Sequence, residues 1–274
     1  MNQEDVTTFY KLNELEQILA KCEDDISSRI EELELKETED NLNFLLYTIG
    51  KSFVTTREII LLCWSGFPDG ALALARNIYE QLIITLYIEK NSEQASLTDI
   101  LHRYNADYSF QRAKCLKYEA QYLSKDKDQL EKYQSVIDEI RTQNNIKKIK
   151  DYWWAAEKGT SFLEICESVI EDNKEMEPLL RLMHLMYKRA CLSLHSSCMG
   201  NRIRLGSDCS GIDMGPWEKG QENALFLSTA SLVYIVSVTY QAMGLVGDDV
   251  NKSLNELTIY YHDIIMERAK KELV

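Results

Sequence analysis

Two opposite charges lie one helical turn apart in an otherwise apolar segment of the chain. The segment is GALALARNIYEQLIITLYI, residues 70–88, and its charges are Arg76 and Glu80. Helical spacing predicts that both side chains share a face with apolar neighbours, so their burial would require further hydrogen bonds. Two interpretations are open: an ion pair that only fixes the register of a helix, or one that serves a functional site.

A second set of polar side chains lies in LLRLMHLMYKRACLSLHSS, residues 179–197. On a helix, Arg189 and Ser193 fall on or beside the apolar face. An arginine against the core needs a partner, and Glu80 or Glu164 could supply it.

Histidine is the side chain best suited to proton transfer near neutral pH. The chain has four histidines, and two of them, His184 and His195, lie about three turns apart on the polar side of this predicted helix. We expect His184 to be solvated, as an isolated histidine on a polar face usually is.

The spacing of cysteine and histidine raises the alternative of a zinc site. Cys191, His195 and Cys198 stand at i, i+4 and i+7, and Cys209 follows in a predicted loop. A helical stripe of small residues explains the same spacing, and we expect neither a metal nor another cofactor.

Basic residues adjoin aromatic ones in NNIKKIKDYWW, residues 144–154. Lysines such as Lys147 and Lys148 could contact phosphates while rings stack on bases, as single-stranded nucleic acid requires. The other interpretation, which we prefer, is a connector in which Trp153 and Trp154 fill the core and the lysines face water.

A long glycine-containing loop, residues 198–220, carries Arg202 and Arg204. Loops of this length in a compact domain are often functional. These two arginines join Lys147 and Lys148 as candidate contacts to nucleic acid.

Composition and periodicity predict the fold class. Three prolines and eleven glycines are few for 274 residues, and the long stretches without strand-like alternation favour an all-α protein. We predict one all-α domain, a helical bundle over residues 1–274, with a more polar helical excursion at about 93–150. The turn SGFPDG should make the helix at 70–88 antiparallel to its predecessor. The expected helices cover about 8–34, 39–63, 70–88, 96–122, 127–143, 160–170, 176–197, 221–244 and 251–271.

The run at 224–247 has no charged residue and is long enough to cross a membrane. Its serines and threonines are explained by a buried bundle helix whose hydroxyls bond back to the helix backbone. A formal net charge of −13 disfavours non-specific binding to nucleic acid or anionic membranes. Scattered cysteines and a polar, acidic start favour a cytoplasmic protein without a membrane span.

The combination of motifs resembles the HEPN (higher eukaryotes and prokaryotes nucleotide-binding) superfamily. Arg189 and His195 fit its loose Arg-x(4–6)-His spacing, and Arg76-Asn-Ile-Tyr-Glu80 lies in an earlier apolar helix. The later helix also contains Tyr187-x5-Ser193-x-His195. The resemblance covers roughly residues 39–244, and the chain is similar as well to an uncharacterised bacterial family of unknown function.

This resemblance implies a HEPN-like bundle, often homodimeric, and a metal-independent endoribonuclease of a toxin–antitoxin or phage-defence system. His195 would act as general acid or base in attack by the ribose 2′-hydroxyl, and Arg189 would stabilise charge on the phosphate. Arg76 and Glu80 would orient these groups, with Tyr187 and Ser193 in support. The implied partners are an RNA substrate, a second copy that packs near residues 179–197, and an antitoxin or defence-system protein.

The alternative function is a non-catalytic helical module that binds a protein partner or a small effector. The acidic composition, the apolar helices and Ala190, which directly follows Arg189, favour it.

Overall fold

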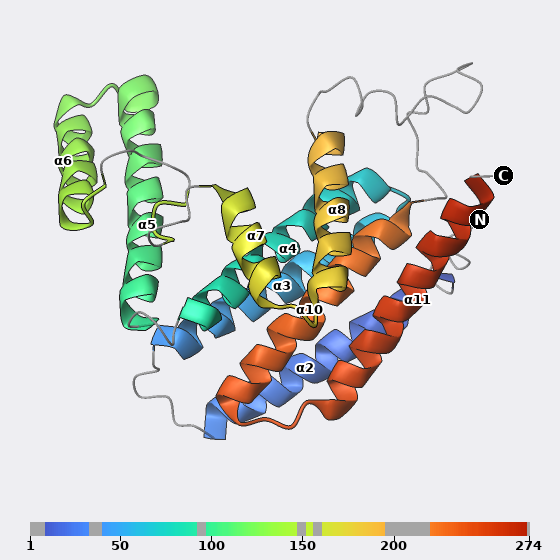
Figure 1. The fold of residues 1–274 in the computed structure, drawn as a ribbon. Helices are drawn as coiled ribbons and strands as arrows, with labels where there is room; N and C mark the ends of the chain where they lie inside the picture. The colour runs from blue at the N-terminus through green and yellow to red at the C-terminus, as the bar shows by residue number, and fades with distance from the viewer. Residues whose placement is uncertain are drawn as a thin grey trace, which may run out of the picture. The chain divides into compact units, whose positions relative to one another are not determined.

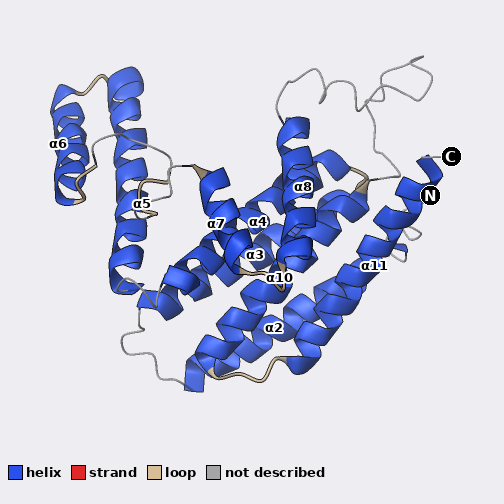
Figure 2. Ribbon diagram, viewed as in Figure 1, coloured by secondary structure: helices blue, strands red, loops and turns tan. Residues whose placement is uncertain are grey.

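The computed structural model describes residues 9–32, 40–91, 97–146, 152–155, 161–194 and 220–272. Across these ranges the chain forms nine α-helices and one short π-helix, η1, and no strand (Figure 2). The predicted all-α class is therefore confirmed. The chain divides into two compact units, one of Met1–Thr85 with Glu175–Val274 and one of Leu86–Lys174.

The first unit is built around α10, the most apolar helix of the chain. Of its 23 residues, 17 are buried, and α11, α3, α8 and α2 all pack against it (Figure 1). This burial explains its composition, because a helix in the middle of a bundle has no solvent face to fill with charge. The helices of this unit are α2 (Leu12–Glu32), α3 (Asp40–Trp64), α4 (Pro68–Asn91, as far as Thr85), α8 (Glu177–Leu194), α10 (Gln221–Met243) and α11 (Asp248–Glu272).

Several serine and threonine hydroxyl groups of α10 bond back to the backbone of the same helix, as predicted. Thr229, Ser231 and Thr239 donate to the carbonyl oxygens four residues earlier at 2.7–2.8 Å. Among the described residues, α10 is the one helix long and apolar enough to cross a membrane by length and composition. Most of its apolar window, 78%, is buried by the other helices, which favours a core helix.

The hairpin of α3 and α4 has the predicted antiparallel arrangement. Gly66 takes a left-handed φ of 77° in the turn, and Pro68 opens α4, where its fixed φ suits the first helical position. Ser52 donates to Gln81 at 2.7 Å, and the side chain of Leu62 lies against Gly70. These contacts pair later residues of α3 with earlier residues of α4, so the helices run in opposite directions.

The second unit holds α5 (Leu97–Glu119), η1 (Ala120–Ser124), α6 (Lys127–Gln143) and α7 (Phe162–Asp172). The polar excursion predicted at about 93–150 corresponds to α5, η1 and α6, and α7 lies beyond it. The small core of this unit is formed by Phe110, Ala113, Ile137, Ile140 and Ile146.

The two tryptophans of the basic–aromatic segment fill this unit. Trp154 is 2% exposed and contacts the rings of Tyr87 and Tyr104 edge-on. Trp153 packs beside Phe110 and donates through Nε1 to Asp107 at 2.6 Å. The preferred interpretation is confirmed for the rings, because both are engaged inside the unit. Lys147 and Lys148 lie outside the described residues.

Candidate functional site

Five polar side chains of the first unit meet where α4 lies against α8. We call them the α4–α8 cluster: Arg76, Tyr79, Glu80, His184 and Tyr187. Residues 76, 79 and 80 share a face of α4, and residues 184 and 187 share a face of α8, because positions three or four apart are neighbours on a helix.

The predicted ion pair is present. Arg76 Nε lies 2.9 Å from Glu80 Oε1, and the Tyr187 hydroxyl donates to the same oxygen at 3.2 Å. The Arg76 guanidinium also stands 5.8 Å from the centre of the Tyr187 ring. The expectation of full burial is wrong, since 27% of the Arg76 side chain and 21% of the Glu80 side chain remain exposed. The pair lies at the rim of the α4–α8 contact, where solutes can reach it.

Behind this pair lies a buried tyrosine–histidine contact. The Tyr79 hydroxyl is 3.2 Å from His184 Nδ1, and the His184 ring stacks on Tyr187 with 5.6 Å between centroids. Tyr79 is 0% and His184 6% exposed. The expectation that His184 is solvated is therefore wrong. The side of α8 that carries His184, which the sequence suggested would face solvent, faces α4 instead. There the Tyr79 hydroxyl forms a hydrogen bond with His184.

The surroundings fix the charge states of Arg76 and Tyr187. Burial lowers the pKa of Arg76, but the hydrogen bond and charge of Glu80 outweigh it and raise the pKa overall. Burial, followed by the charge of Glu80 and the neighbouring Cys191, raises the pKa of Tyr187. The arginine is thus a fixed cation, and the phenol is a hydrogen-bond donor rather than a base.

Arg189 lies away from this cluster. It is exposed, so the expectation that it leans toward the core is wrong. The buried side of α8 is filled by Met183, Met186 and Ala190, and Arg189 projects beyond it. Two residues correspond to about 200° of rotation, which places Arg189 on nearly the opposite side of α8 from Tyr187.

The two acidic partners considered for Arg189 are engaged elsewhere. Glu80 pairs with Arg76, and the carboxylate of Glu164 accepts a hydrogen bond from Ser161 at 3.0 Å. Arg189 shares its exposed side of α8 with Lys188. It is therefore available to an external anion.

Several candidate residues are not covered by the described structure. His195, Arg202 and Arg204 lie outside it, as do Cys198 and Cys209. The backbone of Ser193 belongs to α8, but its side chain is not described. The described part of the chain contains no group of three metal ligands, and the zinc alternative stays a prediction because most of its ligands fall outside that part.

One buried charged group was missed by the sequence reasoning. Glu222, 4% exposed, lies 2.5 Å from Arg268 Nη1, and the Tyr10 hydroxyl is 3.2 Å from its other oxygen. Arg268 Nη2 also donates to the Tyr10 hydroxyl at 3.1 Å. We call these three side chains the Glu222 cluster. Its signal in the sequence was a carboxylate directly before the apolar run at 224–247.

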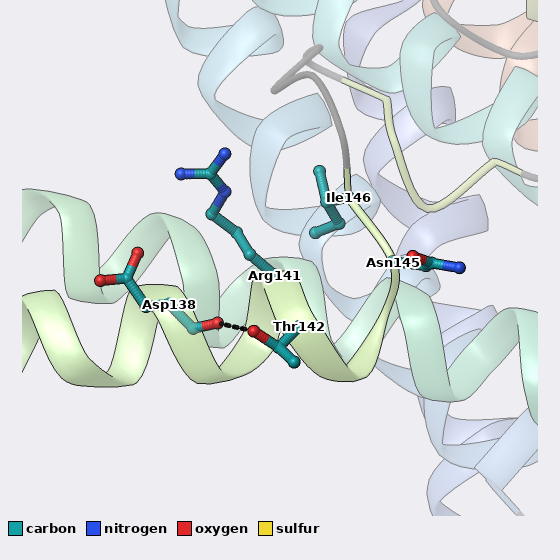
Figure 3. Close-up of a pocket in the computed structure, with 5 residues that line it drawn as sticks. All are labelled: Asp138, Arg141, Thr142, Asn145 and Ile146. Carbon is teal, nitrogen blue, oxygen red and sulfur yellow. Dashed lines mark hydrogen bonds between the residues drawn. The ribbon is translucent and has the colours of Figure 1, made fainter.

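A shallow pocket of about 380 Å³ lies in the second unit (Figure 3). Its lining residues are Asp138, Arg141, Thr142, Asn145 and Ile146, at the end of α6 and the turn beyond. The Thr142 hydroxyl is already used, because it donates to the Asp138 carbonyl at 2.8 Å. The α4–α8 cluster brings more convergent polar groups together and is the better candidate site.

Comparison with known proteins places this site in a family. The model of the family of unknown function DUF5677 matches residues 42–211, which include α3 from its third residue, α4, and α8 with the whole α4–α8 cluster. No curated protein and no solved structure matches the chain. Because the match covers more than half of the sequence, the chain belongs to the family of unknown function DUF5677.

Proposed function

We propose that this protein is a HEPN-like, metal-independent endoribonuclease that acts as a toxin or phage-defence effector in the cytoplasm. The observation that carries the proposal is the α4–α8 cluster, in which the Arg76–Glu80 pair is held by Tyr187. These are the residue types and the chain order on which the HEPN resemblance rests. The exposed Arg189, on the same helix as Tyr187, adds a cation that an RNA phosphate can reach.

In this proposal His195 moves the protons. It takes the proton from the ribose 2′-hydroxyl as that oxygen attacks the phosphorus, or it protonates the leaving 5′-oxygen. Arg189 stabilises the charge that develops on the phosphate oxygens. The products are a 2′,3′-cyclic phosphate and a free 5′-hydroxyl, so neither water nor a metal enters the cleavage step.

Arg76, Glu80, Tyr187 and Ser193 are positioning residues. Arg76 and Tyr187 direct their hydrogen bonds to one Glu80 oxygen, and this contact links α4 to α8, the helix that carries Arg189. Because Arg189 and Tyr187 face different sides of α8, the proposal requires a homodimer or a bound RNA to complete the site. Lys147, Lys148, Arg202 and Arg204 are the proposed RNA contacts away from the chemistry.

The test is incubation of the purified protein with total RNA, beside His195→Ala. We expect cleavage by the wild type, unchanged by EDTA, with 2′,3′-cyclic phosphate ends. The matched control is His262→Ala, since His262 is a partly exposed histidine of α11 far along the chain from the candidate site. Equal cleavage by wild type and His195→Ala would remove His195 from the mechanism. Loss of activity in EDTA would favour the Cys191, His195 and Cys198 metal site.

A second candidate function is a non-catalytic module that binds a protein or a small effector. The specific observation in its favour is that Arg189 does not join the Arg76–Glu80 pair. Absence of cleavage of any RNA by the wild type, with or without divalent metal, would select this function. Its partner would be an antitoxin or another protein of the same defence system.

A further inference from the structure

One face of α3 exposes a regular apolar stripe to solvent. Tyr47, Val54 and Leu61 follow one another at seven-residue spacing and are 80%, 57% and 58% exposed. Gly50 and Trp64, three residues after Tyr47 and Leu61, lie beside them, and both are exposed. We call these five residues the α3 stripe. It covers about 26 Å of helix, and such an exposed apolar row on a protein surface marks a contact site.

The spacing of the α3 stripe is that of helix pairing. Residues that repeat every seven positions, with others three positions later, form the seam of a two-helix contact. Arg57 is the one charged residue of this pattern, and its guanidinium is held by Glu16 and Glu23 of α2. Within the described part of the chain the side chains of the α3 stripe stay exposed, and a different face of α3 supplies the core with Leu45, Ile49, Phe53 and Ile59.

No contact within the described part of the chain accounts for Gly50. It stands inside α3 with a helical backbone, and a Cβ placed there would meet no atom within 4 Å. Glycine inside a helix costs about 1 kcal/mol relative to alanine. A glycine on an exposed seam lets a second helix approach closely, which is a reason for it that the single chain does not provide.

We propose that the α3 stripe pairs with the α3 stripe of a second copy of this chain, antiparallel, about a two-fold axis near residues 54–57. In this register Leu61 of each copy fills the space above Gly50 of the other. Tyr47 lies beside the other copy's Trp64, so large and small side chains alternate along the seam. The proposal does not depend on the ribonuclease activity.

Charge complementarity selects this occupant and this direction. Lys51 and Glu58 flank the α3 stripe on the same side, and among the described residues neither has an ion-pair partner. In the antiparallel register Lys51 of one copy lies beside Glu58 of the other, and the two-fold axis makes this pair twice. A parallel arrangement about a two-fold axis would instead place these charges of the two copies on opposite edges of the seam, where Lys51 and Glu58 could not pair.

This contact differs from the surface predicted by the sequence, which placed a dimer contact near α8. Among the side chains of α8 that the structure describes, Leu185 and Leu192 are large apolar residues that are 46% and 41% exposed, and both stand beside cations. Two copies meeting there would bring Lys188 and Arg189 toward their own equivalents. Like charges oppose such a pairing, whereas the charges beside the α3 stripe favour it.

The test is the oligomeric state, measured by light scattering and analytical ultracentrifugation at micromolar concentrations. We expect a dimer for the wild type and a dissociation constant raised at least about tenfold, or 1.4 kcal/mol, by Val54→Glu and by Gly50→Leu. Gly50→Leu is the sharper variant, because it leaves the interior untouched and improves helix propensity while it blocks the approach of a second helix. Leu185→Glu is the matched control and should leave the dimer unchanged.

The charges provide a second, independent measurement. Lys51→Glu and Glu58→Lys should each weaken the dimer, and the double exchange should restore it, which a merely structural effect would not do. A monomeric wild type would overturn the proposal. So would a dimer that dissociates with Leu185→Glu but not with Val54→Glu.

Discussion

The same three residue types, an arginine, a glutamate and a tyrosine, are used twice in the first unit with different burial. In the Glu222 cluster the carboxylate is 4% and Arg268 28% exposed. In the α4–α8 cluster the carboxylate is 21% and the guanidinium 27% exposed. The two arginines are alike, so the difference lies in the carboxylates. A sealed glutamate serves stability, whereas a glutamate at a rim can also serve a ligand.

The two clusters also differ in how many segments of the chain they connect. The Glu222 cluster joins Tyr10, which lies before α2, to α10 and α11. More than two hundred residues of chain separate Tyr10 from each of its two partners. The α4–α8 cluster joins only two helices, and its ion pair lies within one of them. We therefore expect the first cluster to dominate unfolding and the second to dominate activity.

The largest effect should come from Arg268→Met. It leaves the Glu222 carboxylate buried without its cation, a change that costs about 3–5 kcal/mol. Chemical denaturation followed by circular dichroism measures it. The double variant Arg268→Met with Glu222→Gln should recover part of the loss. An effect no larger than that of Arg76→Met would abolish the distinction between the clusters.

Arg76→Met should destabilise less, by about 1–2 kcal/mol, because water can reach the Glu80 carboxylate that it leaves behind. The same denaturation measurement applies. If the proposed function holds, this variant should lower the rate of RNA cleavage more than Arg268→Met does, when both are assayed well below their unfolding temperatures. A larger loss of cleavage rate in Arg268→Met than in Arg76→Met would instead assign the functional role to the Glu222 cluster.

Alkaline pH should weaken the Glu222 cluster, and also the α4–α8 cluster, because the pKa of Tyr187 is raised as well. Burial, and then the charge of Glu222, raise the pKa of Tyr10, so the folded state keeps this phenol protonated where the unfolded chain loses its proton. Its contribution is complete below about pH 10 and is lost as pH rises above that value, by about 1.4 kcal/mol per pH unit. Tyr10→Phe should flatten this part of the stability curve. A smaller rise of tyrosinate absorbance before unfolding in Tyr10→Phe than in the wild type would show that Tyr10 ionises in the folded protein and would contradict its burial.

The smallest effect should come from Arg189→Ala. Its side chain is exposed and outside both clusters, so the free energy of unfolding should change by less than about 0.5 kcal/mol. Cleavage of RNA should nevertheless be lost if Arg189 contacts the phosphate. A marked loss of stability with retained cleavage would contradict both the placement and the proposed role.

The sequence predicted well those features that depend on neighbours along the chain. The apolarity of 221–244 indicated a core helix, the Ser65–Gly70 turn indicated an antiparallel hairpin, and the spacing of Arg76 and Glu80 indicated their ion pair. Each follows from local geometry or from the composition of one helix.

The features that were missed depend on which helices pack together. His184 looked solvent-facing because nothing in its own helix shows that Tyr79 will cover it. Arg189 was expected to face the core because it lies next to the apolar residues of α8 on the helical wheel. Which residues at the edge of that apolar face are buried depends on how α8 packs against other helices. Glu222 could not be paired from the sequence, since its partners are Tyr10 and Arg268.

The contacts of α2 have a consequence for synthesis. Arg29 donates to the carbonyl of Met243, the last residue of α10, at 2.9 Å, and Asp25 accepts from Tyr240 at 3.0 Å. These partners follow α2 by more than two hundred residues, so a ribosome reaches them roughly 10–40 s later. During that interval the apolar face of α2 lacks the helices that will cover it. Binding by a chaperone would be favoured most at this stage, and the emergence of α10 and α11 would end it.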